Sequence, residues 1–280
     1  MSFRGKILAA VLLSLAAAGT SWAATPDDCL AMRKHGRRPE ARACFQSLTL
    51  ARDAYTRAEG FWGLADYNDA NEQFRAAIAQ SPKNAMYRVR WGRLLNERFN
   101  TADAEGLFNE ALEIDPKYAP AYVGLAIVSA SSFDGKAGPL ASKAIELDPK
   151  LAEAHEILAN VLLEDSDSEK AAAEADEALK ISSDALDALA VHASIELIAD
   201  RSPDAWFAKM NAVNPVYGEG YALVAQNLRL NYRYQDAITY YRKAVELDPQ
   251  LWSARSELGI NLMRLGQEQE ARQQLEMCYN

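Results

Sequence analysis

The chain has 280 residues with 39 acidic side chains and 30 Lys or Arg side chains, so its formal net charge at pH 7 is −9. A chain this acidic has no general electrostatic attraction for nucleic acid or for an anionic membrane surface. Only three His are present, and they lie far apart in the sequence, which argues against a histidine-based metal or catalytic centre.

Segment 1–23 has the features of a secretory signal peptide. Two basic residues precede the apolar run 7–18, and the small residues Ser21 and Ala23 offer a cleavage site. The apolar run is also too short for a comfortable membrane span. We therefore expect cleavage near Ala23 and Ala24, a periplasmic or secreted location, and no membrane insertion after the signal is removed. The alternative is a retained N-terminal anchor.

Segment 24–50 is predicted to form two short helices joined by a turn at His35 and Gly36. Cys29 lies seven residues before Gly36 and Cys44 lies eight residues after it, so the two face each other across an antiparallel hairpin. Export would place them in an oxidising compartment, where we expect a disulfide. A redox-active pair is the alternative, but the C-x-x-C spacing of such pairs is missing.

Five basic residues gather in this hairpin: Arg33, Lys34, Arg37, Arg38 and Arg42. They could bind an acidic partner, or they could simply be solvated on the outer faces of the two helices. No aromatic residues alternate with them, so the solvated arrangement is favoured.

From residue 51 onward the chain repeats itself. Prolines that would end helices occur at intervals of 34, 33, 66 and 34 residues: Pro82, Pro116, Pro149, Pro215 and Pro249. The double interval contains two units, with Ser182 and Ser183 in place of the middle Asp-Pro pair. Within residues 218–251, apolar side chains recur at i, i+3, i+4 and i+7 along two successive stretches, which predicts two amphipathic helices. Proline ends such a helix because it cannot donate an amide hydrogen bond.

A second pattern precedes these prolines. Alanine, an aromatic residue, alanine and proline keep one spacing in three units: Ala70, Phe74, Ala77, Pro82; Ala104, Phe108, Ala111, Pro116; and Ala237, Tyr241, Ala244, Pro249. With its helix–turn–helix period of 34 residues, the chain from about residue 51 resembles the tetratricopeptide repeat (TPR) family. The resemblance implies an all-α, right-handed α-solenoid of helix–turn–helix pairs, which the N-terminal helical hairpin precedes.

We expect about seven repeats in residues 51–280, the last of them incomplete. The small residues where paired helices approach most closely are expected to be Gly92, Gly259, Ala58, Ala126, Ala159, Ala193 and Ala225. Block 214–280 also resembles the repeat region of large secreted bacterial proteins that continue into a zinc-peptidase domain. This second resemblance implies an alternative, in which the chain is the front part of a longer metallopeptidase whose catalytic domain lies beyond residue 280.

No catalytic motif is complete in these residues. His155 and Glu156 begin the zinc signature H-E-x-x-H, but Ala159 stands where the second histidine is needed one helical turn later. His155 and His192 fall in packing positions of the repeat. Phosphate-binding glycine loops and nucleophile motifs are missing as well. We therefore expect no enzymatic activity, no metal, no cofactor and no small-molecule substrate.

The TPR resemblance implies that the first helix of each pair lines a concave groove, which binds a peptide or helix of a protein partner. The residues expected to project there are Trp62, Arg90, Arg93, Asn96, Ile127, Asn160, Gln226, Arg229 and Arg264. Arg90 and Arg93, with Trp62 beside them, would suit an acidic or C-terminal segment docked between the first and second repeats. The alternative is that these arginines pair with Glu59, Glu97 and other acids of the chain itself.

Overall fold

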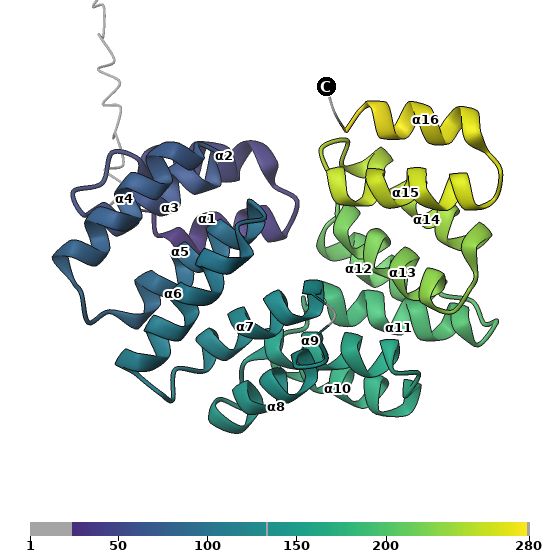
Figure 1. Cartoon of the computed structure of the whole chain (residues 1–280), viewed down its shortest axis with the longest axis horizontal. Helices are drawn as coiled ribbons and strands as arrows, with labels where there is room; N and C mark the ends of the chain where they lie inside the picture. The colour runs from purple at the N-terminus through teal and green to yellow at the C-terminus, as the bar shows by residue number, and fades with distance from the viewer. Residues whose placement is uncertain (1–23, 133, 279–280) are drawn as a thin grey trace, which may run out of the picture.

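The computed structural model describes residues 24–132 and 134–278, and the segment assigned to the signal peptide lies outside them. In the described part the chain forms sixteen α-helices and no strands (Figure 1). None of these helices is long and apolar enough to cross a membrane. An N-terminal pair, α1 (Pro26–Lys34) and α2 (Arg38–Leu48), precedes seven further pairs.

Each of these seven repeats contributes a first and a second helix. The first helices are α3 (Ala54–Gly63), α5 (Ala85–Glu97), α7 (Ala119–Ser132), α9 (Ala152–Glu164), α11 (Leu186–Ile198), α13 (Gly218–Leu230) and α15 (Trp252–Arg264). The second helices are α4 (Tyr67–Gln80), α6 (Thr101–Ile114), α8 (Ala137–Leu147), α10 (Ser168–Ile181), α12 (Asp204–Val213), α14 (Tyr234–Leu247) and α16 (Glu268–Glu276). The predicted all-α solenoid of helix pairs is therefore confirmed.

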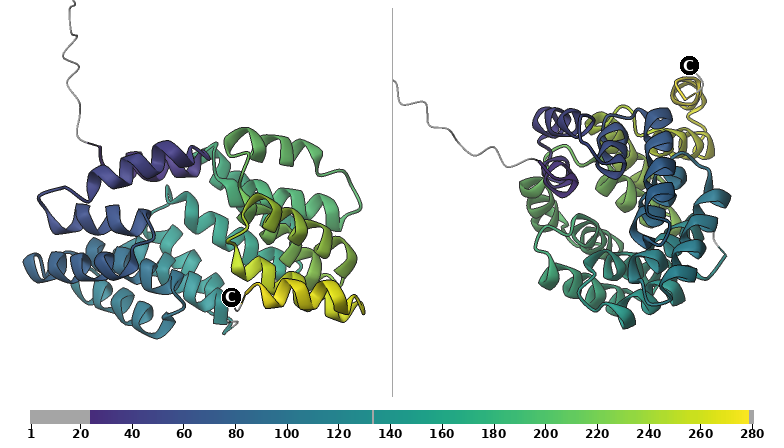
Figure 2. Two further views of the ribbon diagram at one scale, coloured as in Figure 1. Left: turned by 90° about the horizontal axis from the view of Figure 1, so that it is seen from above. Right: turned by 90° about the vertical axis from the view of Figure 1, so that its left-hand side faces the viewer.

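The helix pairs follow a strongly curved path. In Figure 1 the hairpin α1–α2 and the last pair α15–α16 lie at the two ends of an arc, and the first helices α7 and α9 lie on the inside of the second helices α8 and α10. Seen from above, the hairpin reaches across to the helices of the later repeats (Figure 2). The curvature brings segments together that are far apart in the sequence.

The second helices end where the proline pattern predicts. In the residue that follows each of the six helices α4, α6, α8, α10, α12 and α14, φ lies between −133° and −144°. This is the extended backbone that a residue before proline adopts. Ser182 has the same conformation although no proline follows it, and its carbonyl accepts a hydrogen bond from the Ala185 N–H at 3.0 Å. The repeat period therefore continues through the unit that lacks its proline.

Small residues allow the helices to approach closely. The buried ring of Phe108 in α6 lies against Gly92 of α5 and Gly124 of α7, and a Cβ at either glycine would come within 2.6 Å of that ring. Five alanines expected in the equivalent position of other first helices are each 0% exposed: Ala58, Ala126, Ala159, Ala193 and Ala225. The close approach predicted from the sequence is thus confirmed at these positions.

The N-terminal hairpin is a rigid arm attached to the first repeat. Cys29 and Cys44 form a disulfide across it, with their Cα atoms 5.4 Å apart. The ring of Phe45 packs against Gly63 of α3 so closely that a Cβ on this glycine would lie 2.1 Å from the ring. A Cβ on Gly60 of α3 would likewise lie 2.9 Å from the Cβ of Leu48. The base of the hairpin is therefore fixed on α3.

Replacement of Cys29 and Cys44 by serine should lower the free energy of unfolding by about 3 kcal/mol, because the unfolded chain then loses its short closed loop. Hydrogen exchange should show the loss mainly in α1, α2 and α3, since the disulfide lies within the hairpin and the base of the hairpin packs on α3. The matched control is Cys278→Ser, which removes the free cysteine and should change stability by less than about 0.5 kcal/mol. Equal stability of both variants would contradict a stabilising disulfide.

Candidate functional site

Five of the nine predicted binding residues occupy the same position along their first helices. Trp62, Arg93, Ile127, Asn160 and Gln226 are each the ninth residue of their helix, α3, α5, α7, α9 and α13 respectively. Arg93, Asn160 and Gln226 contact first helices of other repeats, and we call the surface that these three residues form the inner face. The inner face is the candidate binding surface.

On the inner face, repeats that are two units apart contact each other. The guanidinium of Arg93 in α5 donates two hydrogen bonds, of 2.8 and 2.6 Å, to the carboxylate of Glu153 in α9. Gln226 of α13 donates to Glu164 of α9 at 2.9 Å. The neighbouring Asn227 donates to the Asn160 side-chain oxygen at 3.1 Å. Polar contacts thus connect the second, fourth and sixth repeats across the inside of the arc.

The exposed hot spot predicted around Trp62 and Arg90 is wrong. Trp62 is only 8% exposed, and its indole N–H donates to Glu97 at 2.7 Å. Arg90 donates two hydrogen bonds of 2.6 Å to Glu59, which is 1% exposed. The Arg90 guanidinium also lies over the Trp62 ring, 4.5 Å from its centroid. The alternative, in which Arg90 pairs with Glu59, is therefore confirmed.

Arg93 also differs from the expectation, because the Glu153 carboxylate already holds its guanidinium. An acidic partner segment would have to displace this carboxylate. The sequence could not indicate the pair, because 60 residues separate its two members.

The other predicted binding residues lie in separate places. Asn96 of α5 is partly buried, and its side-chain oxygen finds no hydrogen-bond partner in the described part of the chain. Ile127 packs against the apolar cluster between the third and fourth repeats. Arg229 lies 3.5 Å from Glu257 of the last repeat. Arg264 is exposed and lies over the Tyr234 ring at 4.5 Å. Only Arg93, Asn160 and Gln226 therefore take part in the contacts between alternate repeats.

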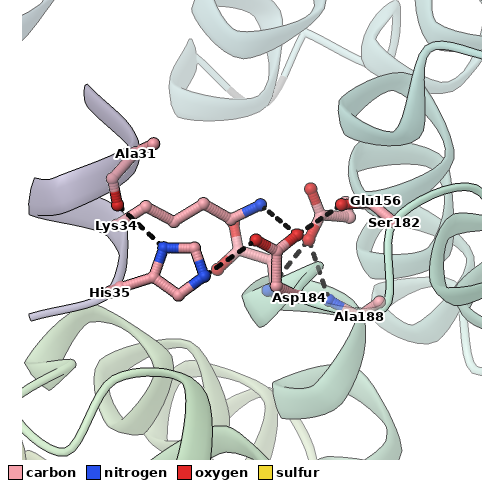
Figure 3. Close-up of polar contacts among 8 residues, drawn as sticks. Ala31, Lys34, His35, Glu156, Ser182, Asp184 and Ala188 are labelled. Atoms are coloured by element: carbon pink, nitrogen blue, oxygen red, sulfur yellow. Dashed lines mark hydrogen bonds and ion pairs between the residues drawn. The ribbon is translucent and has the colours of Figure 1, made fainter. Parts of the chain in front are cut away.

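A cluster of acids beside these contacts was not predicted. Glu156 of α9 accepts hydrogen bonds from the backbone N–H groups of Asp187 and Ala188, at 3.0 and 3.3 Å, and so caps the N-terminus of α11 (Figure 3). The Tyr217 hydroxyl donates to Asp187 at 2.6 Å. Burial, reinforced by the neighbouring Asp187 charge, raises the pKa of Glu156 to about 8. Burial also raises the pKa of Asp187, against the opposing effects of the Tyr217 hydrogen bond and the Lys34 charge.

Glu156→Gln should stabilise the protein at pH 8 by about 1–3 kcal/mol and leave its stability unchanged near pH 4. The folded Glu156 stays protonated up to about pH 8, whereas the same group in the unfolded chain ionises near its ordinary pKa of 4.5. The wild-type protein therefore loses stability as the pH rises from about 4.5 to 8, and a neutral glutamine removes this loss.

Thermal unfolding at pH 4, 6 and 8 measures the effect. The matched control is Glu177→Gln on α10, where a hydrogen bond from exposed Lys180 lowers the carboxyl pKa, so the gain at high pH should be missing. A gain in the Glu156 variant that does not depend on pH would contradict the raised pKa.

Among the described residues, no group of three or more His, Cys, Asp or Glu side chains is arranged to hold a metal ion. His155 and His192 are both 7% exposed, as expected for packing residues. Each contacts one carboxylate: Glu174 lies 2.6 Å from His155, and Asp176 lies 3.0 Å from His192.

Comparison with known proteins agrees with this architecture. The tetratricopeptide repeat family matches residues 55–119, 136–185 and 217–277, which is more than half of the chain. The chain therefore belongs to this family. Among solved structures it is similar to YrrB, a TPR protein with an unusual peptide-binding site, at 18% sequence identity and a TM-score of 0.42. That match covers 66% of this chain and 97% of YrrB. No curated protein matches the chain.

Proposed function

We propose that the chain is a non-catalytic, exported interaction scaffold that holds a peptide or helix of a protein partner against its inner face. The observation that carries the proposal is the set of polar contacts between alternate repeats, formed by Arg93 with Glu153, Gln226 with Glu164, and Asn160 with Asn227. A bound peptide could take over one member of such a hydrogen-bonded pair at a small net cost in free energy, because one hydrogen bond is exchanged for another.

The charges on the inner face favour a partner segment with amide and cationic groups. Arg93 is already neutralised by Glu153. Glu156 and Asp187, in contrast, accept hydrogen bonds from backbone N–H groups and a tyrosine hydroxyl, which are neutral groups. Burial raises the pKa of both carboxyl groups, and a cation placed beside them would favour their ionised forms and pair with the charge that they then carry. This preference replaces the acidic or C-terminal segment expected from the sequence.

Photo-crosslinking in exporting cells tests the proposal. A photoreactive residue at Asn160, on the inner face, should capture a discrete partner protein. The matched control is the same residue at Glu177, which is exposed on the second helix of the same repeat and should capture nothing above background. Capture at the outer position alone would place the binding surface elsewhere and contradict the proposal.

Export is the part of the proposal that concerns residues 1–23. N-terminal sequencing of the mature protein from the periplasm or the medium should begin near Ala24. An N-terminus that still starts at Met1 would contradict cleavage of a signal peptide.

The alternative function is the front region of a longer secreted metallopeptidase. It is supported by the resemblance of block 214–280 to repeat regions that precede zinc-peptidase domains. Reading the gene beyond codon 280 decides between the two. An in-frame continuation that encodes H-E-x-x-H favours the peptidase, and a stop codon there removes it.

A further inference from the structure

The tip of the N-terminal hairpin contacts the later repeats through basic side chains. Lys34 donates to Asp184 at 2.7 Å, and the His35 ring lies 3.3 Å from the same carboxylate (Figure 3). Arg38 lies 3.1 Å from Asp248 and also donates to the Val216 carbonyl at 3.4 Å. The sequence separations are 150 residues for Lys34 with Asp184 and 210 for Arg38 with Asp248.

These contacts fall in the corresponding turns of three consecutive repeats. Asp184, Val216 and Asp248 lie in the turns that follow the second helices α10, α12 and α14. At the centre of the tip, Gly36 has a φ of +69°, and a Cβ added to it would lie 2.5 Å from the side-chain oxygen of Asn214. Only glycine fits this approach without a shift of the neighbouring turn.

The other end of the hairpin is fixed on the first repeat by the packing of Phe45 and Leu48 against α3. The disulfide keeps the hairpin itself rigid. A rigid arm that is fixed on the first repeat and contacts the fourth, fifth and sixth repeats spans the open side of the arc (Figure 2).

We propose that the hairpin is an intramolecular clasp that closes the repeat array into a ring and releases it in a salt-dependent equilibrium. The inner-face contacts of Arg93 with Glu153 and of Asn160 with Asn227 form inside this ring. The clasp itself does not rest on the proposed partner, since it is measured in the free protein.

Different kinds of interaction hold the two ends of the hairpin. At the tip, the ion pairs join partly exposed side chains, with 39% exposure at Lys34 and 50% at Arg38. Exposed ion pairs are individually weak and are screened by salt. At the base, buried apolar packing and a covalent bond do not respond to salt in this way. Opening therefore separates the tip from the later repeats and leaves the hairpin folded on α3.

Distance measurements between two spin labels on non-cysteine handles test the clasp in the full mature protein. Ala43 on α2 and Gln250 after α14 are both exposed and lie on the two sides of the contact. We expect one short distance for the wild type at low salt. A second, longer distance should grow as salt rises to about 1 M, where the Debye length falls to about 3 Å. This titration needs no variant beyond the labels.

Charge reversal gives the matched test. Lys34→Glu with Arg38→Glu should raise the ratio of long to short distances roughly tenfold or more at low salt. Arg37→Glu with Arg42→Glu makes the same change in charge on the same hairpin and should keep the short distance. Arg37 pairs within the hairpin, with Glu40, and Arg42 is exposed on α2.

Restoration completes the test. Asp184→Lys with Asp248→Lys, combined with the reversed hairpin, should return the short distance. The proposal is overturned if salt leaves the distances of the wild type unchanged, or if the control pair opens the ring as far as the Lys34 and Arg38 pair does. A long distance in the wild type at low salt would overturn it as well.

Discussion

Arg90→Ala should lower the free energy of unfolding by about 3–5 kcal/mol, because the buried Glu59 carboxylate then loses its counter-charge and both of its hydrogen bonds from Arg90. The variant also uncovers the Trp62 ring, over which the guanidinium lies. Thermal and denaturant unfolding measure the loss. We expect Arg90→Ala to change folding stability, because the Arg90 guanidinium binds the Glu59 carboxylate of the same chain.

A double variant and a control variant distinguish the effect of a buried ion pair from that of an ordinary surface ion pair. Glu59→Gln combined with Arg90→Met removes both charges and should recover most of the lost stability. The matched control, Arg201→Ala, breaks an ion pair whose arginine is 57% exposed and should cost less than about 1 kcal/mol. If Arg90→Ala cost no more than Arg201→Ala, the buried pair would not support the first two repeats.

Phe108→Ala should cost about 3–5 kcal/mol, the usual range for removing a buried aromatic ring. The ring is 1% exposed and lies between Gly92 and Gly124. Neither glycine carries a side chain that could fill the space, so we expect the upper part of this range. Denaturant unfolding followed by helix content measures the loss.

Phe99→Ala is the matched control, since this phenylalanine is 80% exposed and its loss should change stability by less than about 0.5 kcal/mol. The same small change in both variants would contradict the packing of α5, α6 and α7 around Phe108. A large loss for Phe108 alone also bears on the inner face, because α5 carries Arg93 toward Glu153.

The local architecture could be predicted because it depends on near neighbours in the sequence. Proline imposes an extended residue before it, so Asp115 and Asp248 end their helices where the period requires. Ala159 and Ala225 occupy the close-approach positions because larger side chains would separate the helices. Cys29 and Cys44 face each other across a turn of known length. These features need no knowledge of how the whole array curves.

The candidate site could not be predicted in the same way, because it depends on the curvature of the whole array. Each repeat adds a small rotation, and the sum over several repeats decides which side chains meet. The pairing of Arg93 with Glu153 crosses two repeats, and that of Arg38 with Asp248 crosses most of the chain. The Arg90 prediction failed for a simpler reason. Glu59 on the adjacent first helix is close enough to accept two hydrogen bonds from Arg90, and the pair is largely withdrawn from solvent.

The most direct measurement of the central claim is hydrogen exchange of the mature protein with and without the partner segment identified by crosslinking at Asn160. If the inner face binds the partner, exchange should slow in the first helices α5, α9 and α13, and the second helices α6, α10 and α14 should change little. Protection confined to the second helices, or an exchange pattern that the partner leaves unaltered, would contradict an inner-face scaffold.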